Sequence, residues 1–354
     1  MRGTHRAVTM ITVAVAALGP LATTVASAAS AHPARIKVTT AIPVGRGPFG
    51  VAANPRTGTV YVANTRGNTV SVINGQTNAV VTTIRVGRLP LGAAVNPRTD
   101  TIYVTNGDSR TVSVINGRTN TVTATVPVGR YPEGIAVNPR TGAVYVANTR
   151  GNTVSVINGQ TNTVVATVRI GYPVGVGVNP HTGTVYVAGG RNLVSVINGR
   201  ANTVLATVRV GRDPFGVAVN PRANTIYVTN AASETVSVIS GRANTVVATV
   251  RTGYPAAFGV AADPQAKAVY VANGDDQTMV ISGRTNTVVA RVPVGPCAVG
   301  AATDPRTHTI YVTNLCGNTV SVLVSCRGRC MTSSPRARST SSSFLVRQSA
   351  FGKA

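Results

Sequence analysis

The sequence predicts an all-β protein, a seven-bladed β-propeller built from four-stranded antiparallel blades. Three observations predict this fold. A tyrosine followed by Val and then Ala or Thr recurs at intervals of 41 to 43 residues. Turn residues divide each interval into four short apolar segments, and no segment has the 3.6-residue periodicity of an amphipathic helix. Four strands in about 42 residues, repeated seven times, is typical of propeller blades.

Each repeat carries the same residues at the same positions. The tyrosines are Tyr61, Tyr103, Tyr145, Tyr186, Tyr227, Tyr270 and Tyr311. An Asn-Pro or Asp-Pro pair begins seven residues before each tyrosine, and a Val-Ser-Val-Ile segment or a variant of it follows. We expect the tyrosines to pack between blades. We expect the Asn three residues later, such as Asn64 (Gly189 in the fourth repeat), to hold the following turn through its side chain.

One unit, residues 134–171, shows the expected elements in order. Its four strands are residues 134–138, 143–148, 153–157 and 163–170. In the first turn Pro139 fixes φ and Gly142 is free to adopt a positive φ. The Asn158-Gly159 pair is a strong signal for a hairpin between the third and fourth strands. A β-helix is the competing interpretation, but it needs no tight hairpin turns, and such turns fill this sequence.

The two ends of the repeat region predict how the ring closes. The seventh repeat has its third strand at residues 320–324 and then lacks a fourth. A segment with the pattern of a fourth strand opens the region at residues 36–44. We therefore expect this N-terminal strand to complete the last blade, which removes two open sheet edges.

The repeated motif resembles that of a known family. Tyr-Val-Thr-Asn occurs at 103–106, 227–230 and 311–314, and Tyr-Val-Ala-Asn at 61–64, 145–148 and 270–273. Over residues 35–325 the chain resembles the YVTN-repeat β-propeller family, including its YncE-like and surface-layer-type members. The resemblance implies an exported seven-bladed propeller used for binding or surface display. It implies no shared active site, because the repeated residues are structural.

Both ends of the chain depart from the repeat. Residues 1–31 read as a signal peptide, with basic Arg2 and Arg6, an apolar stretch, and small-residue cleavage sites after Ala28 or Ala31. An uncleaved anchor is the alternative, and no later stretch could span a bilayer as a helix. We expect a secreted or cell-surface protein with its propeller at 32–325. Residues 326–354 form a basic, Ser-rich tail that reads as disordered or as an altered reading frame.

The charge balance favours polyanionic partners and disfavours carboxylate-rich active sites. The chain has 33 Lys and Arg residues against 9 Asp and Glu, a formal net charge of +24. Such a surface attracts nucleic acid or an anionic envelope polymer. Most of the excess falls in the turns that join first to second and third to fourth strands, which we call the lower face, and on the fourth strands. An alternative interpretation is that these arginines only keep a Val- and Thr-rich surface soluble.

Candidate ligand-binding residues lie in the loops of the opposite end, which we call the upper face. These loops join second to third strands, and fourth strands to the next blade. The candidates are Arg46, Phe49, Arg88, Arg130, Tyr131, Glu133, Tyr172, Phe215, Tyr254 and Phe258. Arginine beside stacking aromatics would suit single-stranded nucleic acid or sugars; alternatively, the aromatics plug the seams between blades. Glu133 breaks the repeat most clearly, because its neighbouring repeats carry Phe, Leu or Val.

The four cysteines lie near the C-terminus and fit an oxidising compartment. Cys297 and Cys316 fall in upper-face loops of the seventh blade, so we expect a disulfide between them. Cys326 and Cys330 would pair with each other or stay free. No His, Cys or carboxylate spacing indicates a metal or cofactor site. We therefore expect a monomeric, non-catalytic binding module, with another surface protein as one candidate partner; a lactonase- or lyase-like enzyme at the propeller mouth is the alternative.

Overall fold

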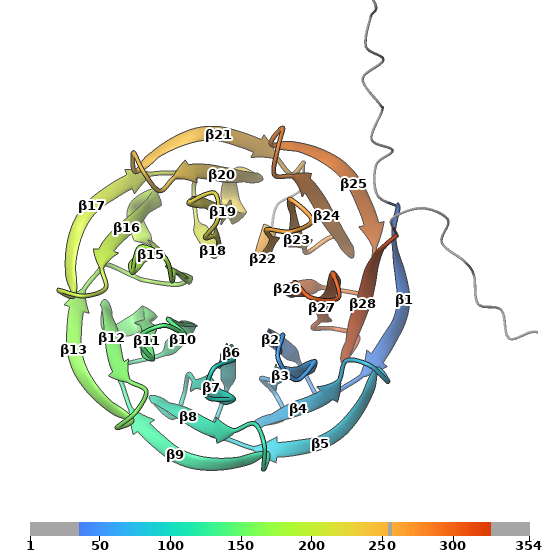
Figure 1. Ribbon diagram of the computed structural model, residues 1–354, viewed down its shortest axis with the longest axis horizontal. Coiled ribbons are helices and arrows are strands. Elements are labelled where there is room, and N and C mark those ends of the chain that lie inside the picture. The colour runs from blue at the N-terminus through green and yellow to red at the C-terminus, as the bar shows by residue number, and fades with distance from the viewer. Residues whose placement is uncertain (1–34, 254–256, 327–354) are drawn as a thin grey trace, which may run out of the picture. The chain divides into compact units, whose positions relative to one another are not determined.

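Seven four-stranded antiparallel sheets follow one another around a ring in the computed structural model (Figure 1). The structure describes residues 35–253 and 257–326. Blades 1 to 6 each take four consecutive strands, from β2–β5 to β22–β25, and blade 7 combines β26, β27 and β28 with β1. The predicted seven-bladed propeller is therefore confirmed. The signal peptide, both of its cleavage sites and the tail beyond residue 326 lie outside the described residues.

Each blade places its first strand beside the central channel and its fourth strand at the rim (Figure 1). The first strands are β2 (Pro48–Asn54), β6 (Pro90–Asn96), β10 (Pro132–Val137), β14 (Val176–Asn179), β18 (Pro214–Asn220), β22 (Ala257–Asp263) and β26 (Ala298–Asp304). The second strands are β3 (Thr59–Asn64), β7 (Thr101–Asn106), β11 (Ala143–Asn148), β15 (Thr184–Gly189), β19 (Thr225–Asn230), β23 (Ala268–Asn273) and β27 (Thr309–Asn314).

The outer half of each blade completes the list of elements. The third strands are β4 (Thr69–Asn74), β8 (Thr111–Asn116), β12 (Thr153–Asn158), β16 (Leu193–Asn198), β20 (Thr235–Ser240), β24 (Gln277–Ser282) and β28 (Thr319–Cys326). The fourth strands are β5 (Ala79–Arg85), β9 (Thr121–Pro127), β13 (Thr163–Arg169), β17 (Thr203–Arg209), β21 (Thr245–Arg251), β25 (Thr287–Pro293) and β1 (Arg35–Pro43). Three short 3₁₀ turns are η1 (Thr149–Gly151), η2 (Gly190–Asn192) and η3 (Ala231–Ser233).

The predicted hairpin between the third and fourth strands is confirmed, because β12 and β13 pair antiparallel. In blade 3, β12 ends at Asn158 and β13 begins at Thr163. The residue with positive φ is Asn162, at 56°, whereas neither Asn158 nor Gly159 adopts one. Gly159 serves another purpose. A Cβ there would collide with the Gly142 carbonyl of its own blade and with the Tyr103 hydroxyl of the preceding blade, so glycine permits both contacts.

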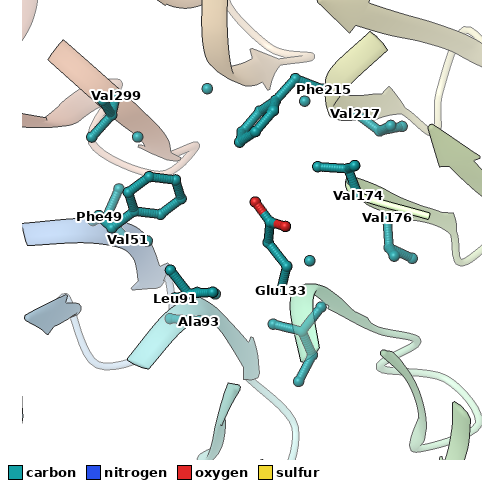
Figure 2. Close-up of a pocket in the computed structure, with 18 of the residues that line it drawn as sticks. Phe49, Val51, Leu91, Ala93, Glu133, Val174, Val176, Phe215, Val217 and Val299 are labelled. Atoms are coloured by element: carbon teal, nitrogen blue, oxygen red, sulfur yellow. The ribbon is translucent and has the colours of Figure 1, made fainter. Parts of the chain in front are cut away.

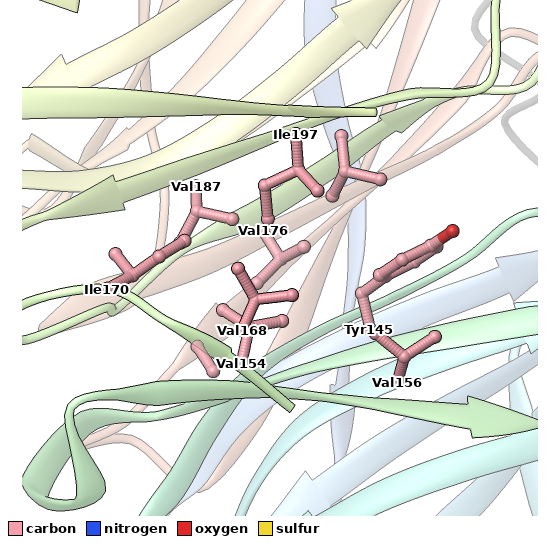
Figure 3. Packing of buried hydrophobic residues seen from close by; sticks show 10 residues of the cluster. Tyr145, Val154, Val156, Val168, Ile170, Val176, Val187 and Ile197 are labelled. Atoms are coloured by element: carbon pink, nitrogen blue, oxygen red, sulfur yellow. The ribbon is translucent and has the colours of Figure 1, made fainter. Parts of the chain in front are cut away.

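The hydrophobic core lies between neighbouring blades. Seven clusters of buried residues each combine side chains from two adjacent blades. In Figure 3, Tyr145 and Val156 of blade 3 pack with Val187 and Ile197 of blade 4. The Tyr145 hydroxyl donates a hydrogen bond to the Gly199 carbonyl at 3.0 Å. The expectation that the repeated tyrosines pack between blades is confirmed.

The repeated asparagines hold the upper-face turns, as expected. Asn64 Nδ2 donates to Thr69 Oγ1 at 3.0 Å and to Ser71 Oγ at 2.9 Å, across the β3–β4 turn. The same pair of bonds recurs in blades 2, 3, 5 and 7. Blade 4 has Gly189 instead, and in blade 6 Met279 stands where the serine would be. The turns of these two blades therefore lack the clamp.

Strand β1 closes the ring. It pairs antiparallel with β28, and Ile42 lies opposite Val320. Ile42 is 3% exposed and packs in the cluster between blades 7 and 1, together with Tyr311. Burial of the Tyr311 hydroxyl, and secondarily the nearby Asp304 carboxylate, raises its pKa to about 12. The predicted closure by the N-terminal strand is confirmed.

The closure predicts equal effects at two equivalent positions. Ile42 of β1 and Ile84 of β5 occupy the same place in their blades, and both are buried. Replacing either by Ala should lower the free energy of unfolding by about 2–5 kcal/mol, because each change leaves a cavity in an interblade core. Urea unfolding measures both. An unchanged stability in Ile42→Ala beside a destabilised Ile84→Ala would show that β1 does not seal the ring.

Candidate functional site

The upper mouth of the central channel is formed by three consecutive positions of each first strand or, in blade 4, by Val174 and Gly175 just before β14 together with Val176. The position nearest the upper face, here called the outermost position, carries a bulky residue in every blade: Phe49, Leu91, Glu133, Val174, Phe215, Phe258 and Val299. The next position is glycine in all seven blades, and the third is Val, Ala or Ile. Residues of these three positions border a cavity of about 160 Å³ (Figure 2).

The glycines at the second position let the first strands approach one another closely. A Cβ on each would overlap the carbonyl oxygen of the outermost residue in the next blade. The glycines are Gly50, Gly92, Gly134, Gly175, Gly216, Gly259 and Gly300, and the last of these meets the Phe49 carbonyl and so completes the circle. The width of the mouth is therefore set by backbone contact, and its chemistry by the residues beside the glycines.

Three phenylalanines form an aromatic wall on part of the mouth. The ring centroids of Phe49 and Phe215 are 6.4 Å apart, and those of Phe215 and Phe258 are 5.3 Å apart. Both pairs are edge-to-face, the arrangement that aromatic quadrupoles favour. The rings of Phe49 and Phe215 border the channel cavity (Figure 2).

Glu133 faces this wall from blade 3. Figure 2 shows its carboxyl group pointing into the space bordered by Phe49 and Phe215. Its Oε2 accepts a hydrogen bond from the Thr149 hydroxyl at 3.0 Å. Burial raises the pKa of Glu133, and the Asp213 charge raises it further, against the Thr149 hydrogen bond and the Arg150 charge. Thr149 was not among the predicted site residues; its place at the start of the 3₁₀ turn η1 puts it beside the carboxylate.

The other predicted site residues lie farther out on the upper face. Arg46, Arg88 and Arg130 are exposed in the loops that enter blades 1 to 3, and none borders the channel cavity. Tyr131 lies beneath the Arg150 guanidinium, whose carbon is 4.1 Å from the ring centroid. Tyr172 is 55% exposed beside a cleft that opens where Gly189 replaces asparagine. Tyr254 lies outside the described residues.

The two upper-face loop types meet as the sequence predicted. In blade 1, Arg66 N donates to the Arg46 carbonyl at 3.1 Å. In blade 7, Cys297 and Cys316 form a disulfide with a Cα–Cα distance of 5.4 Å, so this pairing is confirmed. The side chain of Cys326 and all of Cys330 lie outside the described residues, so their state stays a prediction.

The lower face carries exposed cations without carboxylate partners. They are Arg56, Arg98, Arg118, Arg140, Arg200, Arg222, Arg242, Arg284, Arg306 and Lys267. The described part of the chain has one contact that can be an ion pair. His308 Nδ1 lies 2.7 Å from Asp263 Oδ2, and the two are oppositely charged when the histidine is protonated. The lower-face acids accept hydrogen bonds from the protein itself. Asp100 accepts a hydrogen bond from Asn54, and Asp304 from the Arg306 backbone.

The described residues show neither a cluster of metal ligands nor a membrane-spanning helix. Within residues 35–253 and 257–326, no three His, Cys, Asp or Glu side chains are placed to hold a metal ion. Over the same residues, no helix has the length and hydropathy needed to cross a membrane.

Comparison with known proteins identifies the fold and no family. The chain matches no model of a protein family and no curated protein sequence. A structure of hydrazine synthase from Kuenenia stuttgartiensis superposes with a TM-score of 0.71, at 22% sequence identity, over 79% of this chain and 96% of that one. Because 1680 chains of known structure match, the likeness supports the propeller fold and selects no function.

The position of Glu133 predicts a pH-dependent effect on stability. Burial raises the pKa of Glu133 above its ordinary 4.5, so the folded protein binds this proton more readily than the unfolded chain does. The free energy of unfolding therefore decreases as pH rises through the interval between 4.5 and the raised pKa. Glu133→Gln removes the cost of the buried charge and should be more stable than the wild type at neutral pH.

That advantage of Glu133→Gln should shrink as the pH is lowered to about 4, where the wild-type carboxyl is protonated. Urea unfolding over this pH range measures the difference. Glu234→Gln, at an exposed acid after η3, is the control and should show no such trend. A Glu133→Gln advantage independent of pH would contradict the assignment.

Proposed function

We propose that this chain is an exported member of the YVTN-repeat propeller family, and that it acts as a non-catalytic binding, interaction or surface-display module. The Tyr-Val-Thr-Asn and Tyr-Val-Ala-Asn motifs support the family. In the fold, the motif tyrosines and asparagines make contacts within and between blades, and these contacts recur around the ring. The resemblance, the N-terminal leader pattern and the disulfide support export.

One observation carries the binding role: a single carboxylate stands in an otherwise apolar ring. At the outermost channel position six blades have Phe, Leu or Val, and blade 3 has Glu133. A charged group at this position costs stability, as the raised pKa of Glu133 reflects. Ligand sites are typically concave and mostly apolar, with a few polar groups that fix orientation. The mouth has this composition, so we place the binding site there.

Site-specific photo-crosslinking tests this role. The exported protein, with a photoreactive residue at Leu91 beside the mouth, should crosslink one discrete species from its own cell-envelope fraction. Glu133→Leu should abolish that crosslink; Leu91 shows that leucine is accepted at this position. The same probe at Val81, which is 57% exposed on the rim strand β5, is the control. Equal crosslinking from both probes, or turnover of a substrate that Glu133→Gln abolishes, would overturn the proposal.

A second function, binding of an anionic polymer, is favoured by the lower-face arginines. Their guanidinium groups are exposed, and the acids near them are used in turns. A single-stranded nucleic acid or an anionic envelope polymer would supply the missing counter-charges. Arg56, Arg98 and Arg140 occupy equivalent positions, and in blade 6 Gln265 occupies that position. Arg-to-Gln changes there therefore suit the turn.

Oligo-dT binding as a function of salt tests the second function. The slope of log K against log salt should be negative. The triple change of Arg56, Arg98 and Arg140 to Gln should reduce its magnitude by about 2, at about 0.7 per lost phosphate contact. The matched control changes Arg85, Arg169 and Arg209 on the fourth strands. A slope near zero, or equal effects of the two triple variants, would reject the lower face as a polyanion site.

A further inference from the structure

The channel mouth combines aromatic rings with one carboxylate. On one side, Phe49 and Phe215 present aromatic rings to the cavity. From blade 3, the Glu133 carboxylate points into the same space (Figure 2). The remaining border is aliphatic or glycine, and no Lys or Arg belongs to it. The mouth is thus a small apolar space that holds one carboxylate and is bordered by two aromatic rings.

The carboxylate is only partly satisfied by the protein. Oε2 accepts the Thr149 hydrogen bond, while Oε1 has no hydrogen-bond partner within the described residues. The Arg150 charge acts on Glu133, but the Arg150 guanidinium stacks on the Tyr131 ring and forms no ion pair with the carboxylate. Glu133 therefore retains the capacity to accept hydrogen bonds from a group that enters the mouth.

We propose that the mouth binds an ammonium group carried on a short apolar body, with the cation between the Glu133 carboxylate and the rings of Phe49 and Phe215. This inference rests on the proposed binding role of the same site. A cation is attracted to aromatic faces, most strongly where water is excluded. A charge-assisted contact with a carboxylate is stronger than a neutral one. The methyl or methylene groups next to the nitrogen would pack on Leu91 and Val174.

Other ligand classes fit this mouth less well. An anion would meet Glu133 and no bordering cation. A neutral apolar group would bury the carboxylate without a partner, which costs free energy. The cavity of about 160 Å³ is close to the roughly 150 Å³ that accommodates benzene, so it admits one small head group and no folded polymer. A trimethylammonium or primary alkylammonium head matches both its size and its chemistry.

The inferred contact depends on the charge of Glu133. The groups that act on its carboxyl are the Thr149 hydroxyl and the charges of Arg150 and Asp213. Because burial raises the pKa of Glu133, the carboxylate is lost at a higher pH than an exposed glutamate would be. Affinity for the ammonium head should therefore weaken as pH falls toward that pKa, with no change in the ligand's own charge.

Choline and its uncharged carbon isostere 3,3-dimethyl-1-butanol test the inference directly. Calorimetric titration of the exported protein should show choline binding at least about tenfold more tightly than the alcohol. Glu133→Gln, which keeps the shape and removes the charge, should reduce choline affinity by about tenfold and leave the alcohol unaffected. Phe215→Leu should weaken choline binding too, whereas Glu234→Gln, on an exposed loop, should change neither. Thermal unfolding of each variant confirms that it is folded.

The outcomes separate the ligand class from the binding role. Equal affinity for choline and the alcohol, lost in Glu133→Leu, would overturn the ammonium preference and leave the mouth as a binding site. Choline binding that is unchanged in Glu133→Gln and in Phe215→Leu would overturn the inferred contacts. Absence of binding by either compound would also overturn the inference, while crosslinking at Leu91 judges the proposed function independently.

Discussion

The structure depends on close backbone contact around the inner ring. Seven glycines place their Cα atoms against the carbonyl of the next blade, and the contact from Gly300 to Phe49 returns to the start. Any side chain at these positions would push two first strands apart. Because each blade meets two neighbours, a wider gap at one seam would have to be absorbed by the others. The same contact determines which residues can face the channel, so the shape of the mouth follows from a requirement of assembly.

Each first-strand segment has one position that repeats in every blade and, just before it, one position that varies. The glycine cannot vary, whereas the residue before it is free to differ, because its side chain extends into open space. Phe49, Leu91 and Glu133 show the range that the ring accepts. The outer parts of the blades also tolerate exceptions. In blade 6, Met279 removes a hydrogen-bond partner and leaves buried Asn273 with an unpartnered side-chain amide. Blade 4, with Gly189, also lacks the asparagine clamp, so the ring forms without it in two of its seven blades.

The sequence predicted features that repeat at fixed spacing and could not predict distances from the channel axis. The interblade tyrosines, the closing strand and the Cys297–Cys316 pair all follow from matching equivalent positions. Loop order also placed Arg46 and Phe49 on the same face. Only Gly47 and Pro48 lie between them, and over that distance the chain passes from an exposed loop to the channel wall. No local sequence pattern indicates how far a residue lies from the channel axis. The sequence also could not show that Gly159 in the predicted hairpin lies against the Tyr103 hydroxyl of another blade.

The order in which the strands are synthesised determines when the ring can close. Strand β1 is the earliest of the described strands, and its partner β28 is the last; the bond from Thr39 Oγ1 to the Val322 carbonyl spans 283 residues. Contacts between such distant segments form late, because the loss of chain entropy must be met before they contribute. Until β28 is available, β1 has no partner strand, because β28 is the strand with which it pairs. The native ring thus requires β28, and a product truncated before residue 319 lacks the strand that pairs with β1.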